Sequence, residues 1–322
     1  MKKRILLMEP IHKISYLVFG DNFDVRVAPN TSVEIIKKEI QGVHGVLVRM
    51  APLTGEMIEA ANCLQIISKH GVGIDNIDVQ TATKKGILVV NTGDANSISV
   101  AEHTLIAMGT LTKKIFDMDR AVREGNWERR MAYSAMDLEG KTLGLIGLGR
   151  IGCLVAKKAQ EAFCMKILAY DPYIMISDVA KLRVRLVDDL DRIFKESDVI
   201  SLHIPLTEET KGLVNKKRIS LMKPSAFLLN FSRGEVVDER VLYTALKEKR
   251  IGGAALDVFQ QEPLPKNSPF CKLDNVLLSP HSAMATKECI LRLAKTATQG
   301  IVDFFNGKQP KFVVNPEVLK KN

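Results

Sequence analysis

Three side chains in the second half of the chain have the types needed for acid–base chemistry on a carboxylate substrate. Arg233, Glu262 and His281 each lie in a loop that follows an apolar, strand-like run. A guanidinium can hold a carboxylate through two parallel hydrogen bonds, and an imidazole can take a hydroxyl proton during oxidation and return it during reduction. A carboxylate behind the imidazole stabilises its protonated form. Singly, each residue has an ordinary explanation, as an ion pair, a turn residue or a cap.

A glycine triplet supplies the second chemical pattern, which is typical of a dinucleotide site. Gly147, Gly149 and Gly152 form Gly-x-Gly-x-x-Gly directly after the apolar run 143–146, and an amphipathic helical pattern follows. In that context the first glycine allows a tight turn, the second lets the backbone approach a pyrophosphate, and the third lets the helix pack close to the strand. The N-terminus of the helix then faces the phosphates.

Asp171 ends the next expected strand after this triplet, residues 166–170. A carboxylate there accepts both hydroxyls of an adenine ribose and would repel a 2′-phosphate. The sequence therefore predicts NAD rather than NADP as the cofactor. The combination of strand, triplet, helix, strand and aspartate is far more specific than the triplet alone.

Apolar runs alternate with helical patterns along the chain, and this alternation predicts parallel sheets with helices on both faces. A helical stretch from Ser99 to about Arg123 separates the two parts. The expected strands are 4–9, 24–28, 45–49, 64–68 and 87–91 in the first part, and 142–147, 166–170, 184–187, 199–204, 226–230, 253–258 and 275–279 in the second. The clearest expected helices are 32–40, 54–61, 238–249 and 287–305.

We therefore expect an α/β chain with two doubly wound, parallel-sheet domains. Residues 1–98 and 287–322 would form a flavodoxin-like, substrate-binding domain, because the last helix is too long for a linker and is expected to cross back. Residues 99–286 would form a Rossmann dinucleotide-binding domain. In such a sheet the carboxyl ends of the strands face the ligand crevice, so the three loops with Arg233, Glu262 and His281 should meet.

Composition restricts the class of protein. The formal charge is +9, but the basic residues are dispersed in pairs, which is typical of solvated faces and of steering small anions rather than of binding nucleic acid. Five cysteines without a C-x-x-C pair, and no histidine at zinc-ligand spacing, predict reduced thiols in a cytoplasmic protein without a metal. The N-terminal apolar run stops at Glu9-Pro10, so we expect no signal peptide and no membrane span.

Over essentially its whole length the chain resembles the D-2-hydroxyacid dehydrogenase family, and within it the phosphoglycerate dehydrogenases. The segments that carry this resemblance are HGVGIDNID (70–78), GKTLG with the glycine triplet (140–152), HIPLT (203–207), NFSRG (230–234), ALDVF with Glu262-Pro263 (255–263) and Pro280-His281. The resemblance implies hydride transfer between NAD(H) and a D-2-hydroxy acid or its 2-keto acid, in a homodimer built largely on the dinucleotide domain.

The resemblance also implies roles for individual residues. Arg233 would bind the substrate carboxylate, His281 would be the acid and base, and Glu262 would be its partner. The backbone amides of Val72 and Gly73 would also meet the substrate carboxylate. The expected cofactor contacts are Gly147, Gly149, Arg150, Ile151, Gly152, Asp171, His203, Pro205, Thr207 and, at the nicotinamide carboxamide, Asp257.

The substrate is less well defined by the sequence. Arg49, Lys69 and His70 end expected strands and would form a cationic wall for a second anionic group, which favours 3-phosphoglycerate. An exposed charge at a strand end explains any one of them equally well. Glyoxylate, hydroxypyruvate or lactate would not need such a wall, and sulfolactate is a further alternative. A different class also stays open, because some relatives bind NAD and act as transcriptional corepressors.

Two departures from the family pattern bear on function. The chain ends at residue 322 without the C-terminal regulatory domain of many phosphoglycerate dehydrogenases, so feedback by serine is not expected. After His281 the family usually has glycine, whereas this chain has Ser282-Ala283-Met284. The shape of that loop, and with it the substrate preference, is therefore open.

Overall fold

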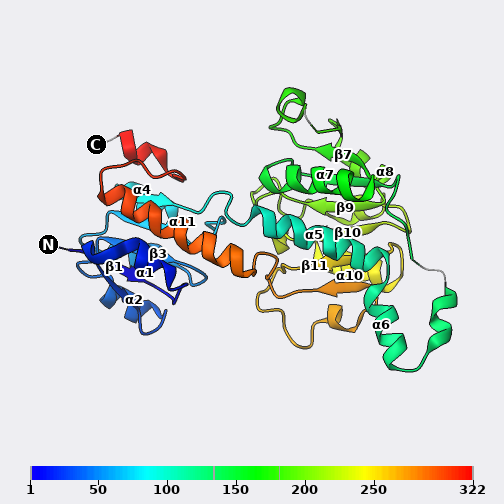
Figure 1. The fold of residues 1–322 in the computed structure, drawn as a ribbon, viewed down its shortest axis with the longest axis horizontal. Coiled ribbons are helices and arrows are strands. Elements are labelled where there is room, and N and C mark those ends of the chain that lie inside the picture. Colours follow the sequence, from blue (N-terminus) through cyan, green and yellow to red (C-terminus); the bar gives the residue numbers. More distant parts are fainter. Residues whose placement is uncertain (1, 133–134, 181, 321–322) are drawn as a thin grey trace. The chain divides into compact units, whose positions relative to one another are not determined.

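The structure, a computed structural model, describes residues 2–132, 135–180 and 182–320. The chain divides into two compact units (Figure 1). Unit 1 comprises Met1–Asn96 and Ala285–Asn322, and unit 2 comprises Ser97–Met284. The chain passes between the units after Asn96 and again after Met284.

Unit 1 is built on a parallel sheet with the strand order β2-β1-β3-β4-β5. The strands are β1 (Lys3–Leu7), β2 (Phe23–Val27), β3 (Gly45–Val48), β4 (Ile66–Lys69) and β5 (Leu88–Val90). This order is the flavodoxin-like one. The five strands expected in the first part of the sequence are therefore confirmed, with ends shifted by a few residues.

Helices cover both faces of this sheet, because successive strand residues point to opposite sides and both sets are apolar. On one face Leu47 and Ile66 pack with Ala297 and Ile301 of the last long helix. The helices on this face are α1 (Ile14–Phe19) and α11 (Lys287–Phe305). The helices on the other face are α2 (Val33–Glu39), α3 (Gly55–Ala60) and α4 (Val79–Lys84). Helix α11 has the predicted bounds and does return the chain to unit 1.

Unit 2 is built on a parallel sheet with the order β12-β11-β10-β9-β6-β7-β8. The strands are β6 (Thr142–Ile146), β7 (Lys166–Tyr170), β8 (Val184–Leu186), β9 (Val199–Leu202), β10 (Phe227–Asn230), β11 (Gly253–Leu256) and β12 (Val276–Leu278). Counted from β6, this is the Rossmann order 3-2-1-4-5-6 with one more strand at the edge. The predicted fold class is thus confirmed for both units.

Helices also lie on both faces of the second sheet. Helices α5 (Ser97–Thr112) and α7 (Arg150–Phe163) pack side by side on one face (Figure 1). The other face is covered by α8 (Leu190–Glu196), α9 (Lys216–Ile219) and α10 (Glu239–Lys247). Short 3₁₀ turns complete the chain: η1 (Gly20–Asn22), η2 (Trp127–Ala132), η3 (Ile176–Val179), η4 (Gly234–Val236), η5 (Pro269–Lys272) and η6 (Pro316–Lys320).

One helix expectation is wrong in its continuity. The sequence predicts a single helical stretch over 99–123, but α5 ends at Thr112 and a second helix, α6 (Ile115–Arg123), follows. Lys114, between them, has φ 54° in the left-handed region, and a residue in this conformation ends an α-helix. Apolar periodicity could not locate this break, because α5 is largely apolar and apolar residues continue into the amphipathic α6 at Ile115 and Phe116.

The structure also bears on the cysteines, on metal binding and on membrane spans in the described residues. All five cysteines are free thiols. Over the described ranges, no group of three or more His, Cys, Asp or Glu side chains is placed to hold a metal ion. The helices of the same ranges are each too short or too polar to span a bilayer.

Candidate active site

The glycine-rich turn joins β6 to α7 at the carboxyl end of the second sheet. Gly147 has φ 96°, and a Cβ on it would lie 2.4 Å from the His203 carbonyl oxygen. A Cβ on Gly152 would lie 2.2 Å from the Gly147 carbonyl oxygen, whereas one on Gly149 would meet open space. The first and third glycines are thus required by packing, and the backbone at Gly149 stays open at the N-terminus of a 14-residue helix. This cradle fits a pyrophosphate.

Asp171 follows β7 and shapes the same turn. Its Oδ2 accepts the N–H of Leu148 at 2.8 Å, and its Oδ1 accepts the N–H of Tyr173 at 3.0 Å. Each carboxylate oxygen has a second lone pair, so both can still accept ribose hydroxyls. The sequence predicted the ribose contact but not this additional role of Asp171 in the turn.

The remaining expected cofactor contacts border this turn. Arg150 and Ile151 are the first residues of α7, and the segment 203–207 follows β9, which is the neighbour of β6 in the sheet. His203 Nε2 lies 2.9 Å from Ser201 Oγ. Thr210 Oγ1 donates to the Pro205 carbonyl at 2.7 Å and accepts the N–H of Thr207 at 2.7 Å. These contacts give the segment a defined shape beside the glycines.

Arg233, Glu262 and His281 follow three neighbouring strands, β10, β11 and β12. The register pairs β10 with β11 and β11 with β12 in parallel. The three loops therefore leave from the carboxyl ends of their strands, at the same end of the sheet as the glycine-rich turn. This placement is the one that the strand pattern predicts.

His281 and Glu262 form a hydrogen-bonded pair. His281 Nδ1 and Glu262 Oε2 are 2.7 Å apart, and Glu262 Oε1 accepts the N–H of Phe259 at 3.0 Å. Contact with a carboxylate assigns the proton to Nδ1, which leaves Nε2 to exchange a proton with a substrate. The side chains of His281 and Glu262 are 40% and 34% exposed, so a small molecule can reach the imidazole.

Arg233 lies in a turn that Asn230, the last residue of β10, organises. The Asn230 side chain is buried, its Nδ2 donates to the Arg233 carbonyl at 2.8 Å, and its Oδ1 accepts the N–H of Ser232 at 3.1 Å. Arg233 itself has an extended backbone before η4, and its Nη1 donates to the Ser232 carbonyl at 2.7 Å. Sequence reasoning missed Asn230, although NFSRG was among the recognised segments.

In unit 1, Arg49, Lys69 and His70 lie at the carboxyl ends of β3 and β4 as expected. Lys69 is 8% exposed, and its Nζ donates to the Arg49 carbonyl and, at 2.6 Å, to Asn76 Oδ1. His70 is 3% exposed, and burial lowers its pKa to about 4, so it is uncharged at neutral pH. Lys69 is therefore engaged inside the unit, and His70 adds no charge, which leaves Arg49 as the main positive group of the expected wall.

Two side chains that sequence reasoning missed hold the turn after β3. Glu9 Oε2 accepts the N–H groups of Arg49, Met50 and Ala51 at 3.1, 2.7 and 3.1 Å. Asn76 Nδ2 donates to the carbonyls of the same three residues at 3.4, 3.2 and 2.7 Å. The backbone around Arg49 is thus fixed from both sides.

Val72 and Gly73 follow β4 in the loop between His70 and Asn76. Asn91 Nδ2 donates to the Val72 carbonyl at 3.0 Å and ties this loop to the end of β5. In the described part of the chain, the N–H groups of Val72 and Gly73 donate to no other residue. Two adjacent backbone donors are therefore open to an anionic ligand at the carboxyl end of the first sheet.

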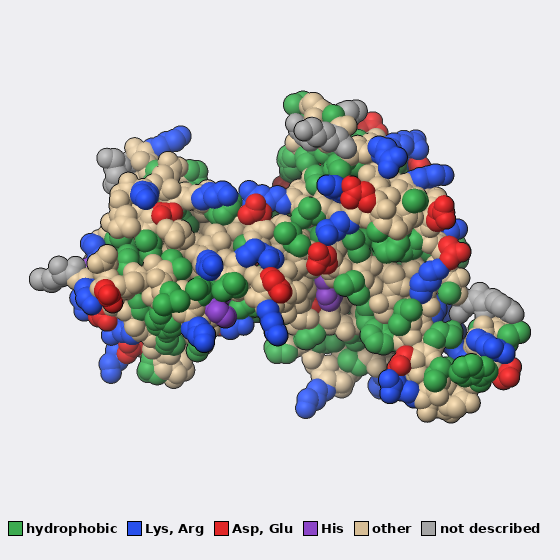
Figure 2. Space-filling view, viewed as in Figure 1, with side chains coloured by type: hydrophobic (Ala, Val, Ile, Leu, Met, Phe, Trp, Pro, Cys, Tyr) green, Lys and Arg blue, Asp and Glu red, His purple; other side chains and the backbone are tan. Residues whose placement is uncertain are grey.

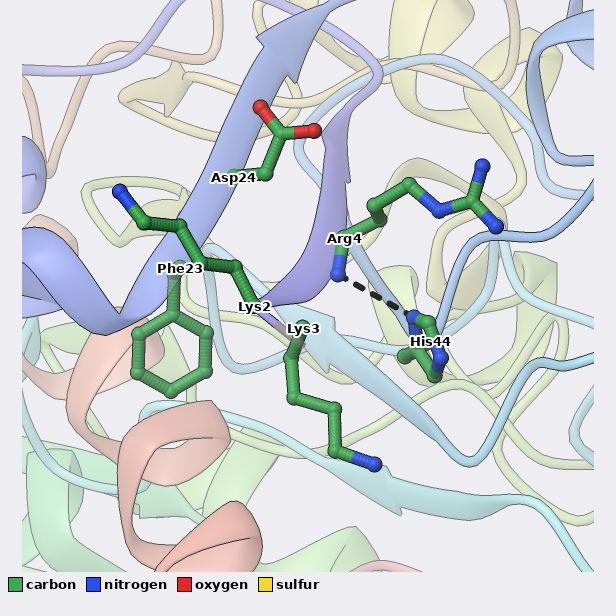
Figure 3. Close-up of a pocket in the computed structure, with 6 residues that line it drawn as sticks. All are labelled: Lys2, Lys3, Arg4, Phe23, Asp24 and His44. Carbon is green, nitrogen blue, oxygen red and sulfur yellow. Dashed lines mark hydrogen bonds between the residues drawn. The ribbon is translucent and has the colours of Figure 1, made fainter.

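A separate hollow of unit 1 lies at the other end of the sheet. It has a volume of about 510 Å³ and is lined by Lys2, Lys3, Arg4, Phe23, Asp24 and His44 (Figure 3). The Arg4 N–H donates to His44 Nδ1 at 3.1 Å across its rim. Since ligands of open α/β sheets bind at the carboxyl ends of the strands, and this hollow is at the amino ends of β1 and β2, it is not part of the candidate site.

Comparisons with known proteins agree with this geometry. The sequence profile described as D-isomer specific 2-hydroxyacid dehydrogenase, NAD binding domain, matches residues 105–283. The D-3-phosphoglycerate dehydrogenase of Methanocaldococcus jannaschii is 41% identical over 97% of this chain and 59% of that protein. The glyoxylate reductase of Korarchaeum cryptofilum is 38% identical over 99% of this chain and 98% of that protein.

A solved structure gives the same result. The NADPH-dependent glyoxylate/hydroxypyruvate reductase of Sinorhizobium meliloti, in complex with NADP and malonate, has a TM-score of 0.87 and 28% identity, over 98% of this chain and 97% of that one. The chain spans 59% of the length of the archaeal phosphoglycerate dehydrogenase and nearly all of the glyoxylate reductase. With a profile over more than half of its residues and relatives over its whole length, the chain belongs to the D-isomer-specific 2-hydroxyacid dehydrogenase family and carries the NAD-binding domain of that family.

Proposed function

We propose that the protein transfers a hydride between NAD(H) and a small D-2-hydroxy acid or its 2-keto acid. The observation that carries this proposal is the 2.7 Å contact between His281 and Glu262. This pair lies at the carboxyl end of the second sheet, where Arg233 and the glycine-rich turn also lie. Arg233 holds the substrate carboxylate through its planar guanidinium. The nicotinamide, when bound, supplies or accepts the hydride.

The protein's own residues manage the proton. In the direction of reduction, His281 is protonated on both nitrogens, and Nε2 donates a proton to the carbonyl oxygen as it becomes a hydroxyl. Glu262 stabilises the imidazolium before that transfer and holds the ring in one orientation afterwards. In the direction of oxidation, neutral Nε2 takes the hydroxyl proton. Asp257 is proposed to lie near the nicotinamide carboxamide.

For the substrate we propose an acid with a second anionic group, 3-phosphoglycerate first, with unit 1 as the substrate-binding domain. Support comes from the phosphoglycerate dehydrogenase relatives and from Arg49 at the carboxyl edge of the first sheet. The observation that favours an alternative, glyoxylate or hydroxypyruvate, is that Lys69 is engaged internally and His70 is uncharged. Lactate and sulfolactate are further candidates for the same site.

Steady-state turnover with NADH or NAD and a panel of acids tests this function. We expect measurable kcat/KM with at least one 2-keto acid of the panel, which comprises the keto forms of 3-phosphoglycerate, malate, sulfolactate, lactate and glycerate, together with glyoxylate. A protein that binds NADH and turns over none of them would contradict the proposal. That result would favour the other class that the sequence left open, an NAD-sensing corepressor.

We further propose that Asp171 makes the enzyme prefer NAD over NADP. Replacing Asp171 by Ser removes the acceptor for the ribose hydroxyls and the charge that opposes a 2′-phosphate. We expect weaker NADH binding and a smaller ratio of kcat/KM for NADH over NADPH. A matched control is Asp198→Asn, which also removes a carboxylate that accepts a backbone N–H, here that of Thr142. A preference of the unaltered protein for NADPH would contradict this assignment.

We propose that the protein is a cytoplasmic homodimer assembled through unit 2. Unit 2 exposes large apolar side chains on α5, α6 and η2, and Figure 2 shows hydrophobic side chains at the surface. The most exposed of these are Ile106, Phe116 and Trp127. Sedimentation velocity at micromolar concentration tests the dimer, and a monomer at every concentration would contradict it.

The free thiols fit a reducing compartment, the cytoplasm. Cell fractionation tests this location.

A further inference from the structure

The turn that carries His281 has a left-handed backbone conformation at the histidine. His281 has φ 50°, in the left-handed region, which is uncommon outside glycine, although Asn, Asp and His adopt it more often than other residues. Within the turn the N–H of His281 lies 3.2 Å from the Ser279 carbonyl oxygen, and further contacts come from outside the turn.

Asp257 makes those contacts on both sides of His281. Its Oδ1 accepts Ser279 Oγ–H at 2.5 Å and the N–H of Ser282 at 2.8 Å, and its Oδ2 accepts the N–H of Ala283 at 2.8 Å. Its backbone carbonyl accepts the N–H of His281 at 2.7 Å. A single residue at the end of β11 therefore binds the residues before, at and after the histidine.

Only a carboxylate fits these donors. Three donor groups converge on two oxygens of a side chain that is 1% exposed. A buried negative charge is stable when such donors satisfy it. An amide of the same shape offers one oxygen, so it would leave a donor of the turn facing an NH₂ group.

A second residue links this arrangement to helix α5. Ser279 Oγ lies 3.4 Å from His103 Nε2, and the His103 ring meets the Phe231 ring edge-on at 5.0 Å between centroids. The first residue of the turn is thus held between Asp257 and a helix that is packed on the sheet. This limits the movement of the turn relative to β11 and β12.

We propose that Asp257 is a positioning residue for His281, one that holds the 279–283 turn so that the imidazole keeps its contact with Glu262. The inference rests on the proposed role of His281 as acid and base. Asn230 provides the parallel on the neighbouring strand, since its buried side chain holds the turn of Arg233 in the same way. On this basis the effect of Asp257 on turnover comes chiefly through His281, and its proposed place near the nicotinamide carboxamide makes the smaller contribution.

Asp257→Asn tests the proposal, with Asp198→Asn as the matched control. Asp198 also accepts a backbone N–H, that of Thr142 at 2.8 Å, but it precedes β9 and so lies at the amino end of the strands, away from the candidate site. We expect Asp257→Asn to lower kcat by about tenfold or more, as a small misplacement of a reacting group does. The Kd for NADH, measured by fluorescence titration, should change by less than about threefold, because the cofactor cradle is untouched. The control should change neither quantity.

A double-mutant cycle separates positioning from cofactor binding. If Asp257 acts through His281, then Asp257→Asn has little further effect on kcat in a His281→Gln background, and the two effects are not additive. A rise in the NADH Kd that matches the loss of kcat/KM, together with additive effects, would make Asp257 a cofactor ligand and overturn the proposal.

A spectroscopic measurement keeps the test independent of turnover. The Nδ1 proton between His281 and Glu262 should give a downfield proton resonance, assigned by its loss in His281→Gln. Asp257→Asn should shift or remove it, and Asp198→Asn should not. If the unaltered protein turns over no acid, the proposed function fails while this readout still tests the positioning. An unchanged resonance in Asp257→Asn would contradict the positioning role of Asp257. Should that variant not fold, Ser279→Ala takes its place, with the same expected direction.

Discussion

Replacing His281 by Ala or Gln is expected to lower kcat by at least about a hundredfold, the usual scale for a general acid or base. The Kd for NADH should stay close to that of the unaltered protein, because the glycine-rich turn and Asp171 belong to other loops of the unit. Binding and chemistry should thus separate in one variant. Stopped-flow turnover and fluorescence titration measure the two quantities on the same sample.

Two controls make this result specific. His12→Gln replaces an exposed histidine of unit 1 and should leave kcat unchanged. Glu262→Gln keeps an oxygen for the Phe259 N–H but loses the charge beside Nδ1, so it should lower kcat while NADH binding is retained. Near-normal turnover in either His281 variant would remove His281 from the mechanism.

The positions of the cofactor turn and of the proposed reacting residues could be predicted because their signals are local. The glycine spacing determines the geometry of the turn after β6, and Asp171 lies at the end of the next strand. Arg233, Glu262 and His281 needed one more step, the rule that carboxyl ends of parallel strands share an edge. That rule places loops but not atoms, and the 2.7 Å contact between His281 and Glu262 came only from the structure.

The supporting residues could not be predicted because their partners are distant in the sequence. Glu9 binds the turn at 49–51, and Asn76 binds the same turn from the other side. A residue type gives a possible charge, but burial and partners decide how that charge is used. For Lys69 and His70 the sequence indicated two cations facing a ligand, whereas the structure has one internal hydrogen-bond donor and one neutral ring.

This difference changes the expected effects of variants in unit 1. Arg49→Ala removes one charged contact to a distal anion, which is typically worth about 1.5–3 kcal/mol, or about ten- to a hundredfold in affinity. We expect KM to rise on that scale for 3-phosphoglycerate, malate and sulfolactate, and to change little for lactate and glycerate. The comparison of kcat/KM across these acids measures the effect, and each acid with a single negative charge is an internal control.

Lys69 should behave differently from Arg49. Because its ammonium group ties the Arg49 carbonyl to Asn76, Lys69→Met loosens the turn that carries Arg49 without removing a group that faces the ligand. We expect a lower Tm and a KM that rises for dianionic acids by less than in Arg49→Ala. In the double variant, Lys69→Met should then add little to KM, since the Arg49 guanidinium that Lys69 helps to position is already absent.

If Arg49→Ala instead slows lactate and glycerate as much as the dianionic acids, Arg49 is not a specificity element. The preference for 3-phosphoglycerate would then lose its physical support in this chain, and a 2-keto acid without a second anionic group, such as glyoxylate, would become the better candidate.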